Sequence, residues 1–231
     1  MTEQPRVIFF DAVGTLFGVR GSVGEVYAEI AKREAGVEAD PETIERTFLD
    51  SFKAAPPAKF PTVEPYQLLE REHQWWYDVV RNTFQRADLL DRFPHFDLFF
   101  DRLFAYFASA DPWFIYPDVF PTLTYWKQQG VELGAISNFD SRLYAVLDAL
   151  DLSPFFSSVT ISTHVGAAKP ESEIFERALA AHDCPPEAAW HVGDSYRDDY
   201  EGARAAGLRG IWLDRKQSSV TSHPASSPVR H

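Results

Sequence analysis

The feature that most constrains the fold is a regular alternation of amphipathic and apolar segments in the second half of the chain. From Val119 onward, each amphipathic stretch is followed by a short apolar run. This alternation favours an α/β fold, a Rossmann-like parallel sheet with helices on both faces and ligands at the carboxyl ends of its strands. Strands are predicted at 131–136, 158–161, 188–192 and 210–213, and helices at 119–129, 140–150, 171–183 and 198–206.

A further strand is predicted near the start of the chain. Val7 to Phe10 form an apolar run that ends in Asp11 and is followed by a Gly14-Thr15 turn. A buried parallel strand that delivers a carboxylate to the edge of a sheet has this pattern. Taken alone, Asp11 is equally well explained as a capping residue after a core strand.

The segment between these two regions has helical rather than strand periodicity. Asp40 followed by Pro41 predicts an N-cap with proline in the first turn of a helix. Because this block follows the first strand, we expect it to lie as a lid over the strand ends. The predicted organisation is a core of residues 1–19 and 113–216, an all-helical cap of residues 20–112 with helices near 22–35, 41–54, 65–87 and 95–109, and a disordered tail of residues 217–231.

Composition narrows the classes of partner. The chain carries a formal net charge of −12 and shows no basic stripe, which argues against nucleic-acid binding. No window approaches the roughly 18 consecutive apolar residues of a membrane helix. The one cysteine, Cys184, excludes an internal disulfide, so we expect a cytoplasmic protein. An anionic small substrate then requires local cations, backbone N–H groups or a metal.

Polar residues cluster at the ends of several predicted strands. Each has an ordinary explanation: Ser137 as a helix cap, Lys169 as a surface charge, and Asp194 as part of a turn. Their coincidence at one edge of a sheet favours a functional site instead. The residues are Asp11, Thr15, Ser137, Asn138, Lys169, Asp194, Asp198 and Asp199.

In this order, Asp-x-x-Gly-Thr, Ser-Asn, Lys-Pro and Gly-Asp-Ser-x-x-x-Asp resemble the motifs of the haloacid dehalogenase superfamily, most of whose members are phosphatases. The resemblance covers nearly the whole chain except the tail. The inserted helices are similar to the cap of the subgroup that includes phosphoglycolate phosphatase and the dehalogenases. Within it, the segments Ser137–Asp140 and His191–Asp194 resemble a little-characterised branch of haloacid dehalogenase-like hydrolase domain proteins, which indicates no particular substrate.

The resemblance implies chemical roles. Asp11 would attack phosphorus to form an aspartyl-phosphate. Asp194 would hold Mg²⁺ together with an oxygen of Asp11 and the backbone carbonyl of Val13. Lys169 would offset the negative charges during catalysis. The implied phosphate-binding residues are Thr15, Ser137, Asn138 and Lys169.

The last motif contains two candidates for a supporting acid. Counting back from Gly202-Ala203-Arg204 favours Asp199, which would orient Lys169 or metal-bound water. Asp198 would then cap the next helix.

Val13 departs from the family pattern. In related phosphatases an acid at this position protonates the leaving oxygen and then activates the hydrolytic water. Valine keeps the backbone carbonyl and loses the acid. Since general acid–base catalysis contributes about 10² to 10⁴ in rate, poor leaving groups are expected to suffer most and good ones least.

Three alternatives stay open besides a Mg²⁺-dependent phosphatase of a small metabolite. The chain is a phosphate-binding or interaction protein if turnover was lost with the acid. A 2-haloacid dehalogenase would share the opening motif, but that family carries Ser in place of Asp194 and uses a cap arginine, for which Arg46 is a loose candidate. A phosphonoacetaldehyde hydrolase would need a cap lysine, for which Lys53 or Lys59 can be nominated.

The cap is rich in aromatic residues, and their spacing indicates a packed stripe rather than a binding surface. The stripe comprises Phe96, Phe99, Phe100, Phe104 and Phe107. If Trp75 or Trp76 faces the site instead, the substrate would carry an apolar or aromatic leaving group. His73 and His191 lack metal-ligand spacing and are interpreted as structural.

Overall fold

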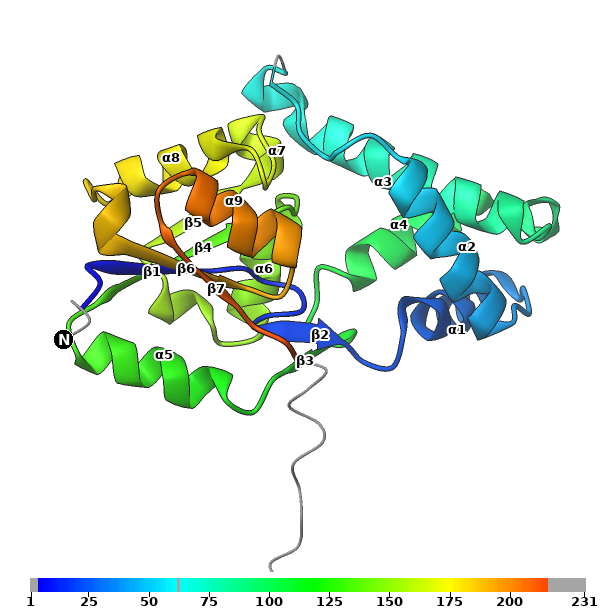
Figure 1. Ribbon diagram of the computed structural model, residues 1–231. Helices are drawn as coiled ribbons and strands as arrows, with labels where there is room; N and C mark the ends of the chain where they lie inside the picture. Colours follow the sequence, from blue (N-terminus) through cyan, green and yellow to red (C-terminus); the bar gives the residue numbers. More distant parts are fainter. Residues whose placement is uncertain (1–3, 62, 216–231) are drawn as a thin grey trace, which may run out of the picture.

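The computed structural model describes residues 4–61 and 63–215. Its centre is a five-stranded parallel sheet of order β5-β4-β1-β6-β7 (Figure 1). The strands are β1 (Val7–Phe10), β4 (Glu132–Ser137), β5 (Ser158–Ile161), β6 (Ala189–Gly193) and β7 (Arg209–Trp212). The predicted α/β fold is therefore confirmed, and each strand begins within one residue of its predicted start.

The middle strand, β1, is buried on both faces. Ile8 and Phe10 pack into one hydrophobic cluster, while Val7 and Phe9 pack into another on the opposite face. Because all the strands run parallel, their carboxyl ends meet at one edge, directly after Phe10. The first cluster lies under α5 (Val119–Gln128) and α6 (Arg142–Ala149), and the second under α8 (Ser172–Ala181) and α9 (Gly202–Ala205).

A separate block of helices stands beside the sheet (Figure 1). These are α1 (Val23–Ala35), α2 (Pro41–Ala54), α3 (Leu68–Arg86) and α4 (Phe96–Tyr106). They have a hydrophobic cluster of their own, which includes Ile30, Ile44 and Phe84. The predicted N-cap of α2 is confirmed, because the Asp40 carboxylate accepts a hydrogen bond from the Thr43 N–H at 2.9 Å.

An antiparallel pair of strands, which was not predicted, joins the two parts. β2 (Phe17–Val19) pairs with β3 (Trp113–Ile115), and Val19 lies opposite Trp113. Both chain crossings between sheet and helical block therefore lie side by side. We propose that the core ends and the cap begins at this pair, with the cap spanning residues 20–112.

Some shorter elements also differ from the prediction. The helix expected at 198–206 is a π-helix, η5 (Tyr196–Glu201), followed by α9, and α7 (Ser162–Val165) was not expected. The part of the chain that the structure describes also contains four 3₁₀ turns: η1 (Pro65–Gln67), η2 (Leu90–Arg92), η3 (Ser153–Phe155) and η4 (Pro186–Ala188). The predicted tail, with His223 and His231, lies outside the described residues. Within residues 4–61 and 63–215, no helix has the length and apolar character that a membrane crossing requires.

Candidate active site

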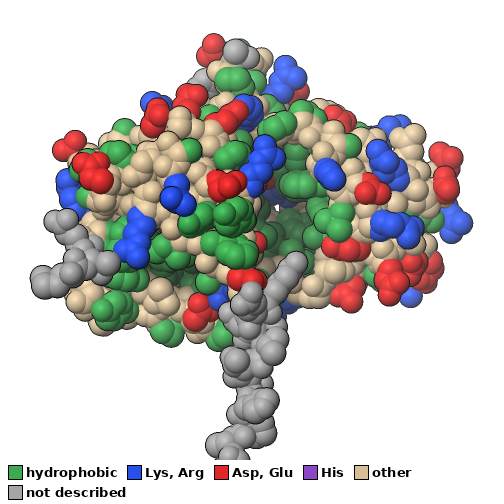
Figure 2. Space-filling model, viewed as in Figure 1, with side chains coloured by type: hydrophobic (Ala, Val, Ile, Leu, Met, Phe, Trp, Pro, Cys, Tyr) green, Lys and Arg blue, Asp and Glu red, His purple; other side chains and the backbone are tan. Residues whose placement is uncertain are grey.

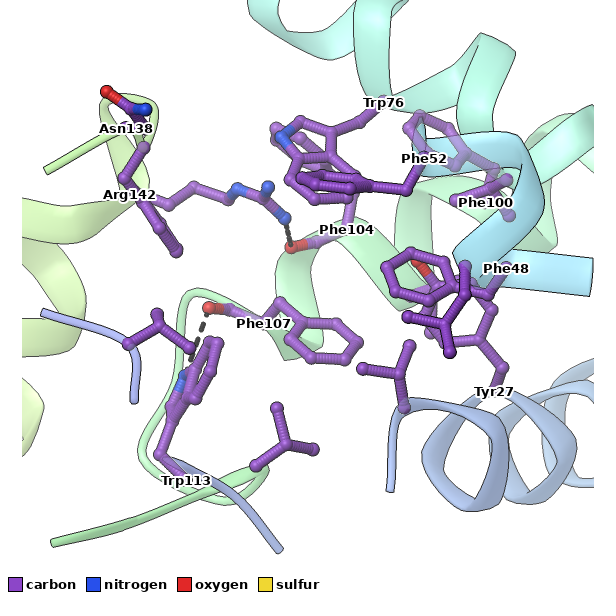
Figure 3. A pocket seen from close by; sticks show the side chains of 17 residues that line it. Tyr27, Phe48, Phe52, Trp76, Phe100, Phe104, Phe107, Trp113, Asn138 and Arg142 are labelled. Carbon is purple, nitrogen blue, oxygen red and sulfur yellow. Dashed lines mark hydrogen bonds between the residues drawn. The ribbon is translucent and has the colours of Figure 1, made fainter. Parts of the chain in front are cut away.

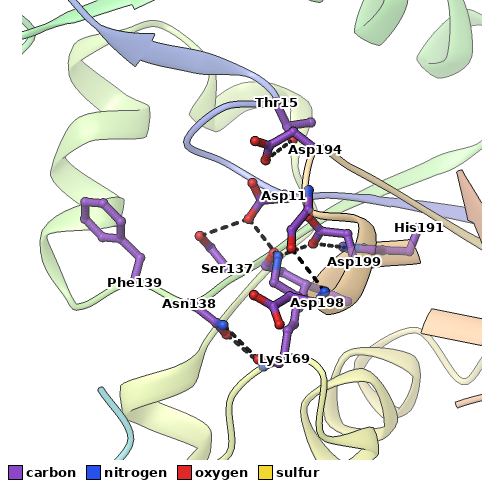
Figure 4. A network of polar contacts seen from close by, with 12 residues as sticks. Asp11, Thr15, Ser137, Asn138, Phe139, Lys169, His191, Asp194, Asp198 and Asp199 are labelled. Atoms are coloured by element: carbon purple, nitrogen blue, oxygen red, sulfur yellow. Dashed lines mark hydrogen bonds and ion pairs between the residues drawn. The ribbon is translucent and has the colours of Figure 1, made fainter. Parts of the chain in front are cut away.

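The Asp11 side chain lies at the carboxyl edge of the sheet, directly after β1 (Figure 4). It is buried, and its backbone N–H donates to the Val192 carbonyl at 2.9 Å, which fixes its place between β1 and β6. Its Oδ1 accepts from Lys169 Nζ at 2.7 Å and, more weakly, from the Ser137 hydroxyl at 3.4 Å. Burial raises the pKa of Asp11, although the Lys169 cation opposes this shift.

Lys169 is a buried cation held between two carboxylates. Besides Asp11, its ammonium group donates to Asp199 Oδ1 at 2.5 Å and to the Ile136 carbonyl at 3.0 Å. These contacts occupy all of its N–H donors. Burial alone would lower the pKa of Lys169, but the charges of Asp11 and Asp199 outweigh burial and raise it. Lys169 is therefore a permanent positive charge beside Asp11.

Asp199 holds Lys169 in place and is itself held by two further donors. His191 Nε2 donates to its Oδ1 at 2.9 Å, and the Ser195 N–H donates to its Oδ2 at 2.9 Å. Although burial acts in the opposite direction, Lys169 and His191 keep the pKa of Asp199 well below its usual range. A side chain at Gly193 would come within 2.1 Å of the Asp199 carboxylate carbon, so this close approach requires glycine.

Two residues of this region differ from expectation. Asp198 does not cap the helix that follows, because the Ser195 hydroxyl accepts the Asp198 N–H at 3.1 Å and is the N-cap of η5. His191, interpreted only as structural, is fully buried and contacts Asp199 directly. Its position inside β6 gave no sign of this contact, which depends on how η5 turns back toward the strand.

Asp194 approaches Asp11 from the loop after β6. The Thr15 hydroxyl lies 3.5 Å from its Oδ1, and a side chain at Gly14, whose φ is +92°, would lie 2.5 Å from its Oδ2. The loop after Asp11 is therefore packed directly against Asp194. Burial, and then the charges of Asp11 and Asp199, raise the pKa of Asp194 to about 6.

These residues suit a hard divalent cation. Carboxylate oxygens of Asp11, Asp194 and Asp199 lie within 4.8 Å of one another. Asp199 is engaged by Lys169, His191 and Ser195, which leaves Asp11 and Asp194 as the available ligands. Burial is the main cause of the raised pKa of Asp194, and the charges of Asp11 and Asp199 add to it. Carboxylate oxygens gathered in this way are the ligands that Mg²⁺ takes.

The Asn138 side chain is committed to the protein itself. Its Nδ2 donates to the Lys169 carbonyl at 2.9 Å, and its Oδ1 accepts the Lys169 N–H at 2.8 Å. This pair of hydrogen bonds positions the backbone that carries Lys169. The backbone N–H of Asn138 and the second hydrogen of its Nδ2 stay available to a phosphate.

Of the three cationic cap residues considered from the sequence, only Lys59 lines the same cavity as Lys169. Arg46 lines a depression with Ser22 and Glu45 on another part of the cap, and the Lys53 side chain is exposed. Lys59 lines a cavity that it shares with Lys169, but its amine is paired with Glu171.

Trp75 and Trp76 both line the cavity that contains Lys169 and Asn138. Trp76 also lines the second cavity beside Asn138, and its Nε1 donates to Asp140 Oδ2 at 2.6 Å. The Trp75 Nε1 donates to the Pro56 carbonyl. His73 lies 2.9 Å from Asp101 and packs against Phe100 and Phe104. Among the described residues it belongs to no group of three potential metal ligands.

Comparison with known proteins places this geometry in a family. The family model described as haloacid dehalogenase-like hydrolase matches residues 5–207. The chain belongs to the haloacid dehalogenase-like hydrolases. This hydrolase is 35% identical to haloacid dehalogenase-like hydrolase domain-containing protein 3 of Mus musculus, over 98% of this chain and 86% of the relative. The resemblance inferred from the motifs is thereby confirmed, as is the assignment as a hydrolase.

Solved structures share the fold of this haloacid dehalogenase-like hydrolase at lower identity. A phosphatase of the family from Thermococcus onnurineus matches with a TM-score of 0.60 and 23% identity, covering 91% of this chain and 87% of the other. The L-2-haloacid dehalogenase from Xanthobacter autotrophicus matches with a TM-score of 0.62 and 20% identity, covering 96% and 85%. Because both activities occur on one fold, the reaction has to be argued from the site.

Proposed function

We propose that this hydrolase is a Mg²⁺-dependent phosphatase of a small phosphorylated molecule, acting through an aspartyl-phosphate on Asp11. The observation that carries the proposal is the Asp194 carboxylate beside Asp11. The 2-haloacid dehalogenases, which share the opening motif, carry Ser at the position of Asp194. The buried Lys169 cation, 2.7 Å from Asp11, supports the same reading. The Lys169 cation, and a Mg²⁺ ion bound by Asp194, would offset the negative charge of a phosphoryl group.

In the first step an Asp11 oxygen attacks phosphorus, so that an O–P bond forms while the bond from phosphorus to the leaving oxygen breaks. Water then attacks the same phosphorus, releases phosphate and regenerates the Asp11 carboxylate. Lys169 stays protonated and offsets negative charge throughout. The Ser137 hydroxyl, which contacts Asp11, is placed to donate to a phosphate oxygen. Mg²⁺, held by Asp11, Asp194 and the Val13 carbonyl, would supply further charge neutralisation when bound.

Val13 sets the limits of this chemistry. Without an acid at this position, the leaving oxygen departs as its own anion or takes a proton from water. Esters with good leaving groups are therefore the expected substrates. The same absence slows activation of the hydrolytic water, so the phosphorylated form of Asp11 should accumulate.

The test is phosphate release from acetyl phosphate and p-nitrophenyl phosphate, with Mg²⁺ or with EDTA. Turnover should require Mg²⁺ and should fall by at least about a thousandfold in Asp11→Asn, the loss typical of removing a nucleophile. Asp111→Asn, which removes an exposed carboxylate elsewhere, should match the wild type. Metal-independent turnover, or full activity in Asp11→Asn, would contradict the proposal.

A second candidate function is phosphate binding without turnover, which the missing acid at Val13 favours. In that case inorganic phosphate should bind in the presence of Mg²⁺ while none of the esters is hydrolysed. Dehalogenation is the third candidate and is disfavoured by Asp194. Chloride release from 2-chloropropionate in EDTA would support it.

A further inference from the structure

An apolar cavity of about 290 Å³ lies between the helical cap and the edge of the sheet (Figure 3). Figure 2 shows the molecule hollowed between its two parts, with hydrophobic side chains gathered there. The cap contributes aromatic walls from all four of its helices, α1 to α4, and the core closes the cavity next to the candidate active site. The aromatic cap residues are Tyr27, Phe48, Phe52, Trp76, Phe100, Phe104 and Phe107.

Val13 forms part of this cavity, two residues after Asp11. An acid at this position would place a charge in the wall, whereas valine continues the apolar lining. Asn138, which follows β4 and holds Lys169, borders the same cavity. A molecule that occupies the cavity therefore also approaches the residues that would hold a phosphate.

The one cation in the lining is already neutralised. Arg142 donates through Nε to Asp140 Oδ1 at 2.8 Å and through Nη2 to Oδ2 at 2.7 Å, and Asp140 is buried. The guanidinium carbon lies 3.8 Å from the centre of the Phe104 ring. Stacked and doubly paired in this way, Arg142 offers a flat face rather than a free charge. Asn138 and Tyr27 contribute the neutral amide and hydroxyl groups of the lining, so a carboxylate in the cavity meets no unpaired cation.

We propose that this cavity binds an uncharged aromatic leaving group, so that the substrates are aryl phosphomonoesters. This inference rests on the proposed phosphatase function. The cavity has about twice the volume of the roughly 150 Å³ void that takes up benzene in an engineered protein, so it suits a group of one or two rings. Phenols ionise near pKa 10, and an aryl oxide therefore leaves without the acid that Val13 lacks.

Binding of non-hydrolysable phosphonates tests the cavity separately from turnover. Calorimetry in Mg²⁺ should show benzylphosphonate binding at least tenfold more tightly than methylphosphonate, because the ring is removed from water. 4-Carboxybenzylphosphonate should lose this advantage, because its carboxylate would give up water without meeting an unpaired cation in the lining. Similar affinities for the benzyl and methyl compounds, or no binding of either, would overturn the inference.

Substitutions in the lining test whether the benzyl group binds in this cavity. Phe52→Gln, at a lining residue that is 45% exposed, should reduce the benzyl preference at least fivefold, while Tyr66→Gln, an exposed aromatic outside the cavity, should leave it unchanged. Leu49→Gln, also in the lining and exposed, gives a second reading if Phe52→Gln misfolds. An unchanged preference in a folded lining variant would place the ring elsewhere and overturn the inference.

The two proposals fail in different measurements. If acetyl phosphate turnover is metal-independent or independent of Asp11, the proposed function is wrong, and the phosphonate affinities still decide what the cavity binds. If acetyl phosphate turnover behaves as proposed and the benzyl preference is missing, only the inference about the leaving group is wrong.

Discussion

At the scale of single residues, Val13 separates metal binding from proton transfer. Its backbone carbonyl is a proposed ligand of Mg²⁺, while its side chain lines an apolar cavity. Val13→Asp should therefore raise kcat/KM for an alkyl phosphate, such as methyl phosphate, by about 10² to 10⁴, with a smaller gain for acetyl phosphate. It should also weaken benzylphosphonate binding, because it places a charge in the cavity wall.

Val13→Asn is the control for this experiment, since it has nearly the same shape as Val13→Asp but no acid. It should show no gain with methyl phosphate. Equal rates for the Asp and Asn variants would mean that the missing acid is not what limits turnover.

The shifted pKa of Asp194 predicts how the stability of the protein depends on pH. Its folded pKa of about 6 lies above its ordinary value of 3.8, so ionising Asp194 destabilises the metal-free protein. This penalty is absent below about pH 4, grows between about pH 4 and pH 6, and is constant at higher pH. In EDTA, Asp194→Asn should therefore have a higher Tm than the wild type at pH 8 and a similar Tm at pH 4.

The effect of Mg²⁺ on Tm tests the assignment of Asp194 as a metal ligand. Added Mg²⁺ should raise the Tm of the wild type at pH 8 and have little effect on Asp194→Asn, because a ligand that binds only the folded state stabilises it. Asp111→Asn serves as the matched control and should respond to Mg²⁺ like the wild type. A wild-type Tm that is insensitive to Mg²⁺ would contradict the assignment of Asp194 as a metal ligand.

At the scale of elements, a buried carboxylate on α3 ties the helical cap to the core. Glu72 Oε1 accepts from the Ser141 N–H at 3.1 Å, from the Ser141 hydroxyl at 3.0 Å, and from the Thr163 hydroxyl. Glu72→Ala removes the acceptor of all three bonds, of which only the Ser141 hydroxyl keeps another partner, His164. It should lower the free energy of unfolding by about 2–3 kcal/mol. Denaturant unfolding measures this, with the exposed Glu70→Ala on the same helix as control. Equal losses in the two variants would show that the contact contributes no stability.

The main elements were predictable because their burial leaves a clear pattern. β1, at the centre of the sheet, is a continuous apolar run, and α2 begins at an Asp-Pro pair, so both were located correctly. β2 and β3 have three residues each, too few to establish a period, and they form only because distant segments meet. The π-helix η5 differs from an α-helix in hydrogen-bond register, which residue type does not reveal.

The candidate site was predictable to a similar extent. Asp11, Lys169 and Asp199 follow or flank predicted strands, and the structure brings their charged groups into contact. The sequence did not indicate that the Asn138 side chain would form hydrogen bonds with the Lys169 backbone, or that His191 would donate one to Asp199. Both contacts depend on the paths of loops between elements, for which periodicity carries no information.

At the scale of the whole molecule, charge and shape affect substrate capture. The net charge of −12 should repel a phosphate ester at a distance. Raising the ionic strength from about 0.01 to about 0.15 M shortens the screening length from roughly 30 to 8 Å, so kcat/KM for acetyl phosphate should rise by about two- to threefold. The steady-state rate at both ionic strengths, with Mg²⁺ saturating, measures this. A fall in kcat/KM would mean that the local field of Lys169 dominates.

The central claim is that Asp11 becomes phosphorylated and that Val13 slows the loss of the phosphoryl group. The most direct measurement is mass spectrometry of the peptide that contains Asp11, after acid quenching of a reaction with acetyl phosphate and Mg²⁺. One phosphoryl group should be found on Asp11 in the wild type, less in Val13→Asp, and none in Asp11→Asn or in EDTA. Phosphate release with the phosphoryl group on another residue, or with an unmodified Asp11 at every quench time, would contradict the account.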